Sequence, residues 1–270
     1  GSGDEVDINV TVDEKPSGAL LAGIGFSQSD GIVLNASISQ DNFVGTGKRV
    51  SLAAQTSSAN QAYQIAYTNP YHTVDGISRG FNLSYRATDF DELDTADYKI
   101  DTGIIGVNYG IPLSESNRFN FGFDLRQIDF ETGSAPSQEV LDFESAEGNS
   151  FLDFDTTISW REDSRDSAIF PKRGATQSLS AEFTIPGSDL TYYKLSYKQR
   201  RYWPLADNLV FSLNGDISYG DSYGDTTILP LWVNFFGGGP STIRGCQARS
   251  VGARDSQGDP IGGNAAYFGN

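Results

Sequence analysis

The chain has 270 residues, 38% hydrophobic and 12% aromatic, and its formal net charge of −16 argues against a nucleic-acid partner. A single cysteine, Cys246, excludes an internal disulfide framework and a cysteine-based zinc site. No stretch reaches the ~18 consecutive apolar residues that a membrane-spanning helix needs, and no run has convincing amphipathic helical periodicity.

The first eighteen residues differ from the rest of the chain. Residues 1–3, Gly-Ser-Gly, look like a cloning scar and are set aside. Residues 4–15 alternate apolar and polar side chains, which is typical of a half-buried strand, and Pro16-Ser17-Gly18 then interrupts the alternation. We interpret 4–15 as the last strand of a preceding soluble domain, followed by a hinge into a second domain over 16–270.

Alternation of apolar and polar side chains then recurs to the end of the chain and predicts an all-β, antiparallel fold. The apolar faces mark eleven strands and the start of a twelfth, over 18–27, 32–39, 50–54, 61–67, 81–86, 105–109, 119–126, 152–160, 178–185, 193–200, 209–219 and 264–268.

Two features favour a transmembrane β-barrel over a soluble barrel or sandwich, which stays open as the alternative. We expect strands of about 9–11 residues, the length that crosses a bilayer at a tilt. Long acidic connections over 87–97, 131–150 and 221–263 alternate with short turns, which is the arrangement of outer-membrane barrels. In such a barrel the apolar side chains face lipid and the polar alternates line a wet lumen.

The strand count implies an incomplete barrel. Bacterial single-chain barrels have an even number of strands, and an open sheet edge cannot face lipid with unpaired amides. We therefore expect this chain to be part of a longer barrel, or to have its edges paired by another chain.

Few residues suggest chemistry. His72 is the only histidine, so no Ser-His-Asp arrangement has support, and we expect it to be a turn residue. Asp153 and Asp155 share one strand face, which hydration of a lumen explains without catalysis. Asp89 and its acidic neighbours lack the spacing of a calcium loop. We therefore expect no catalytic residue, no metal site and no cofactor.

One stretch stands out between the last two predicted strands. Residues 234–247 read Asn-Phe-Phe-Gly-Gly-Gly-Pro-Ser-Thr-Ile-Arg-Gly-Cys-Gln, and three glycines with a proline cannot continue a strand. The context suggests a loop folded back onto another part of the molecule, with Arg244 at its tip. The simpler alternative is an exposed surface turn.

That stretch resembles the sixth extracellular loop of the BamA family of outer-membrane insertases, in which an aromatic-Gly-Gly segment precedes Val/Ile-Arg-Gly-aromatic. Four further stretches match the family in order and spacing from about residue 16 to the end. They are 40–47 (Gln-Asp-Asn-Phe-Val-Gly-Thr-Gly), 68–76 (Thr-Asn-Pro-Tyr-His-Thr-Val-Asp-Gly), 170–174 (Phe-Pro-Lys-Arg-Gly) and 184–188 (Thr-Ile-Pro-Gly-Ser).

The resemblance implies a domain organisation and a lumen loop. Residues 16–270, including the long loop 221–263, would be the N-terminal part of a sixteen-stranded outer-membrane barrel, and 4–15 would end the last POTRA domain. The lumen-loop motif would be Ile243, Arg244, Gly245 and Cys246, with Arg244 pairing with acidic groups on later strands. Cys246 stands where the family has an aromatic residue, so native anchoring of the loop is reduced.

The resemblance also implies that the first strand is one side of a lateral seam, where a client strand would pair by β-augmentation. The pairing residues would be Gly18, Ala19, Leu20, Leu21, Ala22, Gly23, Ile24, Gly25 and Phe26. Glycines in this strand fit weak pairing, but they fit barrel curvature equally well.

The functional hypothesis from the sequence is a non-enzymatic outer-membrane insertase. Its partners would be client outer-membrane β-barrel proteins, accessory outer-membrane lipoproteins and the lipid bilayer, with no nucleic acid. The first alternative is a pore or a two-partner secretion transporter of the same superfamily. The second is a purely structural or adhesive barrel.

Overall fold

The computed structural model describes residues 11, 16–27 and 30–269. The expected cloning scar at 1–3 and, except for residue 11, the predicted strand over 4–15 lie outside the described residues. None of the helices in the described ranges is long and apolar enough to cross a membrane.

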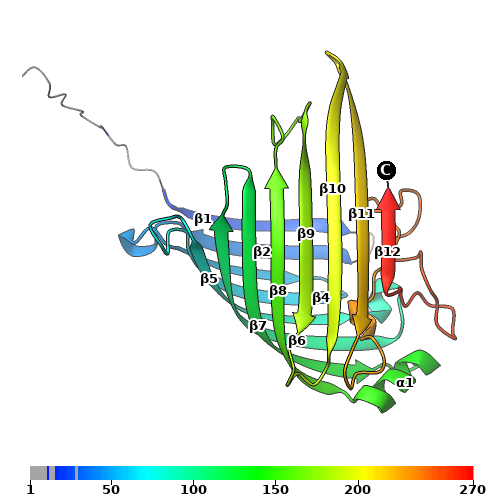
Figure 1. The fold of residues 1–270 in the computed structure, drawn as a ribbon. Helices are drawn as coiled ribbons and strands as arrows, with labels where there is room; N and C mark the ends of the chain where they lie inside the picture. Colours follow the sequence, from blue (N-terminus) through cyan, green and yellow to red (C-terminus); the bar gives the residue numbers. More distant parts are fainter. Residues whose placement is uncertain (1–10, 12–15, 28–29, 270) are drawn as a thin grey trace, which may run out of the picture.

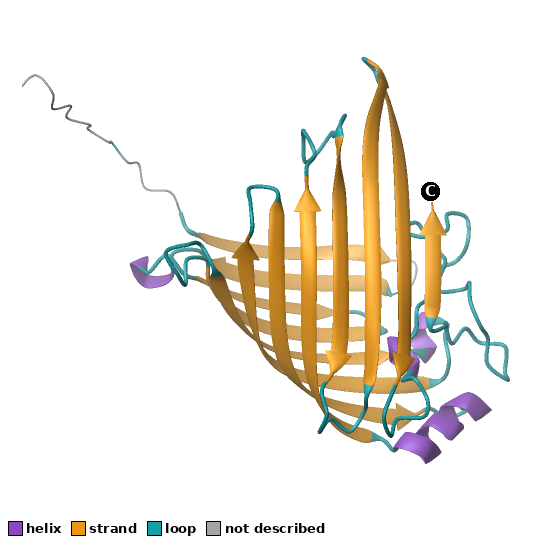
Figure 2. Ribbon diagram, viewed as in Figure 1, coloured by secondary structure: helices purple, strands orange, loops and turns teal. Residues whose placement is uncertain are grey.

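Twelve antiparallel strands form one sheet in which every strand pairs with its neighbours in sequence, from β1 to β12 (Figures 1 and 2). The strands are β1 Gly18–Ser27, β2 Gly31–Gln40, β3 Arg49–Thr56, β4 Asn60–Asn69, β5 Ser78–Asp89, β6 Tyr98–Pro112, β7 Asn117–Thr132, β8 Ser150–Asp163, β9 Gly174–Thr184, β10 Tyr192–Ala206, β11 Leu209–Ser222 and β12 Ala265–Gly269. The prediction of an all-β partial barrel is confirmed.

The sheet curls, and its two ends differ (Figure 1). At the short-turn rim lie the connections 41–48, 70–77, 113–116, 164–173 and 207–208. At the opposite end, here called the loop end, lie the longer connections 90–97, 133–149 and 223–264. The α-helix α1, Gln138–Glu147, and two of the short 3-10 helices, η2 Asp91–Leu93 and η3 Leu231–Val233, also lie in loop-end connections, whereas η1 Phe43–Gly45 lies in a short turn.

One face of the sheet is apolar and open. Its large side chains are exposed from β1 through β11, for example Phe26 at 82%, Ile65 at 48% and Ile217 at 61%. A soluble sandwich would cover this face with a second sheet, and the described residues form only one. Exposed aliphatic and aromatic side chains on a continuous sheet face fit contact with hydrocarbon.

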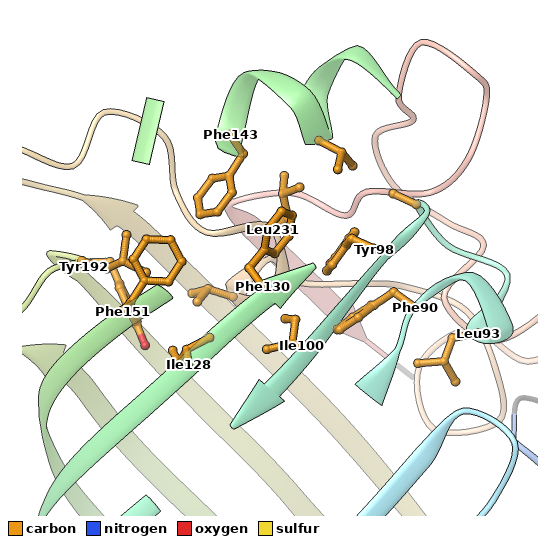
Figure 3. Packing of buried hydrophobic residues seen from close by; sticks show 14 of the residues in the cluster. Phe90, Leu93, Tyr98, Ile100, Ile128, Phe130, Phe143, Phe151, Tyr192 and Leu231 are labelled. Atoms are coloured by element: carbon orange, nitrogen blue, oxygen red, sulfur yellow. The ribbon is translucent and has the colours of Figure 1, made fainter. Parts of the chain in front are cut away.

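The main buried core lies at the loop end (Figure 3). There Phe143 from α1 packs near Leu231 of η3 and Phe130 of β7, with Tyr98 of β6 beside Phe130. Trp232 contacts Phe143 with ring centroids 5.3 Å apart. We call this cluster, with α1, 90–97 and 226–233 around it, the cap.

Two expectations about the elements were wrong, namely the strand lengths and the absence of a helix. Strands β6, β7, β8, β10 and β11 have 14–16 residues instead of about 9–11. The loop-end parts of β6 and β7 bury residues such as Ile100 and Ile128 under the cap instead of ending with the bilayer. Helix α1 was not expected either, because it buries only Val140 and Phe143, too few apolar positions for a visible helical period.

Candidate functional site: an open strand edge and a lumen-facing loop

Strand β1 is an edge strand. It pairs with β2 over ten residue pairs from Gly18↔Gln40 to Ser27↔Gly31, and no described strand pairs with its other edge. Although β1 is one of the most apolar segments of the chain, nine of its ten residues are exposed. An exposed edge of this kind is a template for another strand.

One backbone hydrogen bond shows which residues of β1 bond to β2 and which have their backbone groups on the other edge. The backbone N–H of Asp41 donates to the carbonyl of Ser17 at 2.7 Å, so residues 17 and 41 form a hydrogen-bonded pair. Along the unbroken register, the odd-numbered residues of β1 therefore bond to β2. The backbone groups of Leu20, Ile24 and Phe26 point to the open edge.

Two glycines of β1, Gly23 and Gly25, lie on the lumen side, whereas Gly18 lies on the same outward face as Leu20. A Cβ on Gly23 would lie 2.9 Å from the side-chain oxygen of Asn35, and one on Gly25 would meet no atom within 4 Å. The β1–β2 ladder has no bulge, so weak pairing through an irregular ladder is absent here. What the glycines remove is cross-strand side-chain contact, which normally stabilises a sheet.

The long loop after β11 returns along the inner face of the sheet. Phe235 and Gly263 exchange backbone hydrogen bonds at 2.8 and 3.0 Å, and Gly237 and Val251 do so at 3.0 Å each. Further in, the N–H of Gly239 donates to the carbonyl of Cys246 at 3.1 Å. The loop therefore narrows, as a hairpin does, towards the predicted motif.

The tip of this loop borders a cavity of about 570 Å³. Ile243 and Arg244 line it from the loop, and Arg200 of β10 and Asn214 of β11 line it from the lumen face of the sheet. Arg244 is exposed and makes no hydrogen bond or ion pair with any described residue. Gly245 has φ +87°, and Cys246 is exposed.

A second arginine of the loop makes contacts that the sequence did not reveal. Arg249 has φ +60°, and its guanidinium lies over the rings of Phe90 at 5.8 Å and Phe236 at 5.7 Å. Next to it, the Gln247 amide donates to a carboxylate oxygen of Asp94 at 2.7 Å. These contacts attach the base of the tip to the connection between β5 and β6.

Helix α1 holds the long loop at two points. Glu147 accepts hydrogen bonds from the backbone N–H and hydroxyl of Thr227, both at 2.8 Å, and from the N–H of Ile228 at 3.1 Å. At the other end of the helix, Glu139 accepts from the N–H and hydroxyl of Ser256 at 3.0 and 2.9 Å. The bond from the Ser256 backbone lowers the pKa of Glu139.

Asp153 and Asp155 do not lie in a hydrated lumen, so that expectation was wrong. Both side chains are fully buried beneath the cap. Asp155 pairs with the Arg126 guanidinium at 3.3 Å, and Asp153 accepts the backbone N–H of Leu190 at 2.9 Å. Arg126 also donates to the Tyr192 hydroxyl at 2.8 Å. These contacts compensate part of the buried charge, although Oδ2 of Asp153 has no hydrogen-bond partner among the described residues.

Within the described ranges, no cluster of three or more His, Cys, Asp or Glu side chains is arranged to hold a metal ion. His72 lies in the turn between β4 and β5, with its ring centroid 6.3 Å from that of Tyr109.

Comparisons with known proteins point to one superfamily. The sequence pattern of the Omp85 superfamily domain matches residues 42–269. Outer membrane protein assembly factor BamA of Neisseria meningitidis serogroup B is 32% identical over 280 aligned residues, covering 100% of this chain and 35% of that protein. This chain thus spans about a third of the length of that curated relative.

Solved structures of BamA and CdiB proteins also match this chain. The crystal structure of BamA from Haemophilus ducreyi lacking POTRA domains 1–3 matches with a TM-score of 0.88 at 26% identity, over 95% of this chain and 52% of that one. CdiB from Escherichia coli matches with a TM-score of 0.55 at 14% identity, over 88% and 46% of the two chains. The second likeness is one of fold alone.

Proposed function

The chain belongs to the Omp85 superfamily, and from this premise we propose that it is barrel sequence of an outer-membrane insertase that folds client β-barrels into the membrane without covalent catalysis. The resemblance to BamA inferred from the sequence is confirmed. Like those relatives, the protein is an outer-membrane β-barrel protein. The activity of the whole protein is part of the proposal, because the chain spans 35% of the curated relative.

The observation that carries the proposal is the strand β1, whose second edge pairs with no described strand. Its outward backbone groups belong to even-numbered residues such as Leu20, Ile24 and Phe26, whose side chains are 75–82% exposed. A client strand that adds antiparallel or parallel to this edge would satisfy both sets of amides. In hydrocarbon each unpaired amide costs several kcal/mol, so a template lowers the barrier to inserting a strand.

Proline substitution tests the template with little harm to the β1–β2 hairpin. Because the Ile24 amide faces the open edge, I24P removes no ladder bond to β2, and proline is tolerated on the outer side of edge strands. The client strand would lose one hydrogen bond and meet the proline ring. We expect client pairing to fall by about five-fold or more, since one hydrogen bond contributes about 1 kcal/mol.

The measurement is disulfide crosslinking between a cysteine at Ala22 and a cysteine in the terminal strand of a client, in the full-length protein. The exposed Cys246 is first replaced by serine to remove a competing thiol. I24A, which keeps the amide, is the matched control and should crosslink normally. A heat-modifiable gel shift confirms folding of each variant. Normal crosslinking and insertion by folded I24P would contradict the proposal.

Accessory outer-membrane lipoproteins remain a prediction from the resemblance, as no described surface identifies them. Co-purification of the full-length protein from outer membranes tests it. Lipoproteins that copurify with the wild type and with I24P would show that their binding is separate from the seam.

A pore or transporter is the second candidate. The likeness to CdiB from Escherichia coli is one of fold alone. The loop tip on the inner face and the cap at the loop end both occupy space that a conducting lumen needs. These features favour the insertase.

A further inference from the structure

Two outward-facing arginines near the short-turn rim are built into similar surroundings. We call Arg79 of β5 and Arg201 of β10 the rim arginines. Each lies two residues from an aromatic side chain on the same outward face, Phe81 for the first and Trp203 for the second. In both, the guanidinium carbon lies 5.3 Å from the ring centroid.

Each ring is in turn supported by an aromatic residue on the neighbouring strand. Phe81 is the register partner of Tyr67, with ring centroids 6.1 Å apart. Trp203 is the register partner of Phe211, with stacked rings 5.5 Å apart. The same three-part arrangement of arginine, ring and cross-strand ring therefore occurs twice, on strands far apart in the sheet.

The two rim arginines lie at a similar level. Arg79 is the second residue of β5, just after a short turn. Arg201 is the register partner of Ala175, the second residue of β9. Both positions therefore lie at the short-turn end of the sheet, the end at which the strands of an outer-membrane barrel leave the bilayer. The longer β10–β11 hairpin carries Trp203 beyond this level.

Neither rim arginine has a hydrogen-bond or ion-pair partner among the described residues, in a chain with 35 acidic residues. Nε of Arg79 is buried and unsatisfied. At the loop end, outward polar side chains are paired. Lys99 binds Asp89 at 2.8 Å, and the hydroxyl of Tyr219 donates to Asp221 at 3.0 Å.

A planar guanidinium stacked on an aromatic ring keeps its donors free for a bidentate anion, and phosphate matches that geometry. The surroundings favour a lipid over a free ion. Arg201 is the register partner of Leu213, which is 52% exposed, and Phe81 is 46% exposed. Acyl chains can cover those surfaces while the headgroup lies at the rim.

We infer that the two rim arginines bind the phosphate groups of glycerophospholipids in the leaflet on the short-turn side, each with its ring as a platform. The inference rests on the placement in the outer membrane. It does not depend on strand templating at β1, so its failure would leave the crosslinking result untouched.

The test is native mass spectrometry of the full-length protein with phosphatidylglycerol and with diacylglycerol of the same acyl chains. We expect R79Q and R201Q each to weaken phosphatidylglycerol binding about two- to five-fold, the range of an exposed charge interaction. Diacylglycerol binding should not change. Because Arg200 neighbours Arg201 on the chain but faces the lumen cavity, R200Q is the matched control and should bind like the wild type.

Lysine variants distinguish the loss of a phosphate contact from a loss of folding. R79K and R201K keep the charge but lose the planar fork, so a partial loss of binding supports the site, given an unchanged heat-modifiable gel shift. Three results would overturn the inference. The first is that R200Q loses as much phosphatidylglycerol binding as R79Q and R201Q. The second is that R79Q and R201Q lose diacylglycerol binding to the same extent as phosphatidylglycerol binding. The third is that millimolar inorganic phosphate displaces the lipid, which would indicate a free-anion site.

Discussion

At the scale of single residues, Gly174 shows how strictly a short turn can fix one position. It has φ +94° at the start of β9, and a Cβ there would collide with the backbone of Ser164 and Arg165. We expect G174A to destabilise the barrel by about 1–3 kcal/mol, the cost of a strained backbone conformation. Urea unfolding in detergent measures it.

Gly215 of β11 provides the control for that substitution. It lacks a positive φ, and a Cβ there would meet no atom within 4 Å. The urea concentration at the midpoint of unfolding should therefore be close to the wild-type value for G215A. Equal destabilisation by both variants would mean that the Gly174 backbone is not the cause.

Glu139 makes attachment of the long loop dependent on pH. Its pKa is lowered by the hydrogen bond from the Ser256 backbone. A carboxyl whose pKa falls on folding stabilises above its unfolded pKa, about 4.3, and loses that effect as pH falls through the lowered value. We expect protection of the Ser256 amide from hydrogen exchange to be full at pH 7 and to fall below about pH 4.

E139Q should show reduced Ser256 protection at pH 7 already, because its amide is a weaker acceptor than a carboxylate. D142N is the matched control, since Asp142 accepts from Gln138 on the same helix and has no bond to the loop. A wild-type protection factor that stays constant to pH 3 would contradict the assignment.

Candidate residues could be selected from the sequence only where a local motif marks them. Ile243 and Arg244 were identifiable because glycines and a proline surround them in a fixed order. Arg249 and Arg126 gave no such signal. Arg249 lies over Phe90, and Arg126 pairs with Glu182, contacts between segments that are distant in the chain. Only the fold brings those partners together.

At the scale of elements, α1 connects the cap to the long loop, and its Phe143 is fully buried. We expect F143A to destabilise the cap by about 3–5 kcal/mol, the cost of emptying a buried aromatic site. Hydrogen exchange should rise across 226–233, which packs against this ring through Trp232. L141A, at a 41% exposed position of the same helix, should change little.

The strands were predictable because apolar and polar residues alternate along a strand that has one face buried and the other in contact with water. The residues at which the strands begin and end were harder to predict. The 105–109 segment became β6, Tyr98–Pro112, since its loop-end residues are buried by the cap instead of by lipid. A helix that buries two residues of a mostly acidic connection leaves almost no periodic trace.

At the scale of the whole molecule, two groups of described residues lie on the lumen side of the open sheet. The cap covers the loop end, and the tip carrying Arg244 lies against the lumen face of β10 and β11. A lumen filled in this way should conduct poorly. We therefore expect the full-length protein in planar bilayers to show small, brief conductance steps, whereas a passive pore would show large, stable ones.

Deleting residues 240–246 tests whether the loop tip is the obstruction. The bonds between Phe235 and Gly263 and between Gly237 and Val251 lie outside the deletion, so the base of the loop can stay in place. We expect larger conductance after deletion, because the tip leaves the cavity beside Arg200. G245A keeps the tip, although it strains the φ of +87° at that position, and this variant should conduct like the wild type. Large, stable conductance in the wild type would favour the pore and contradict a closed insertase barrel.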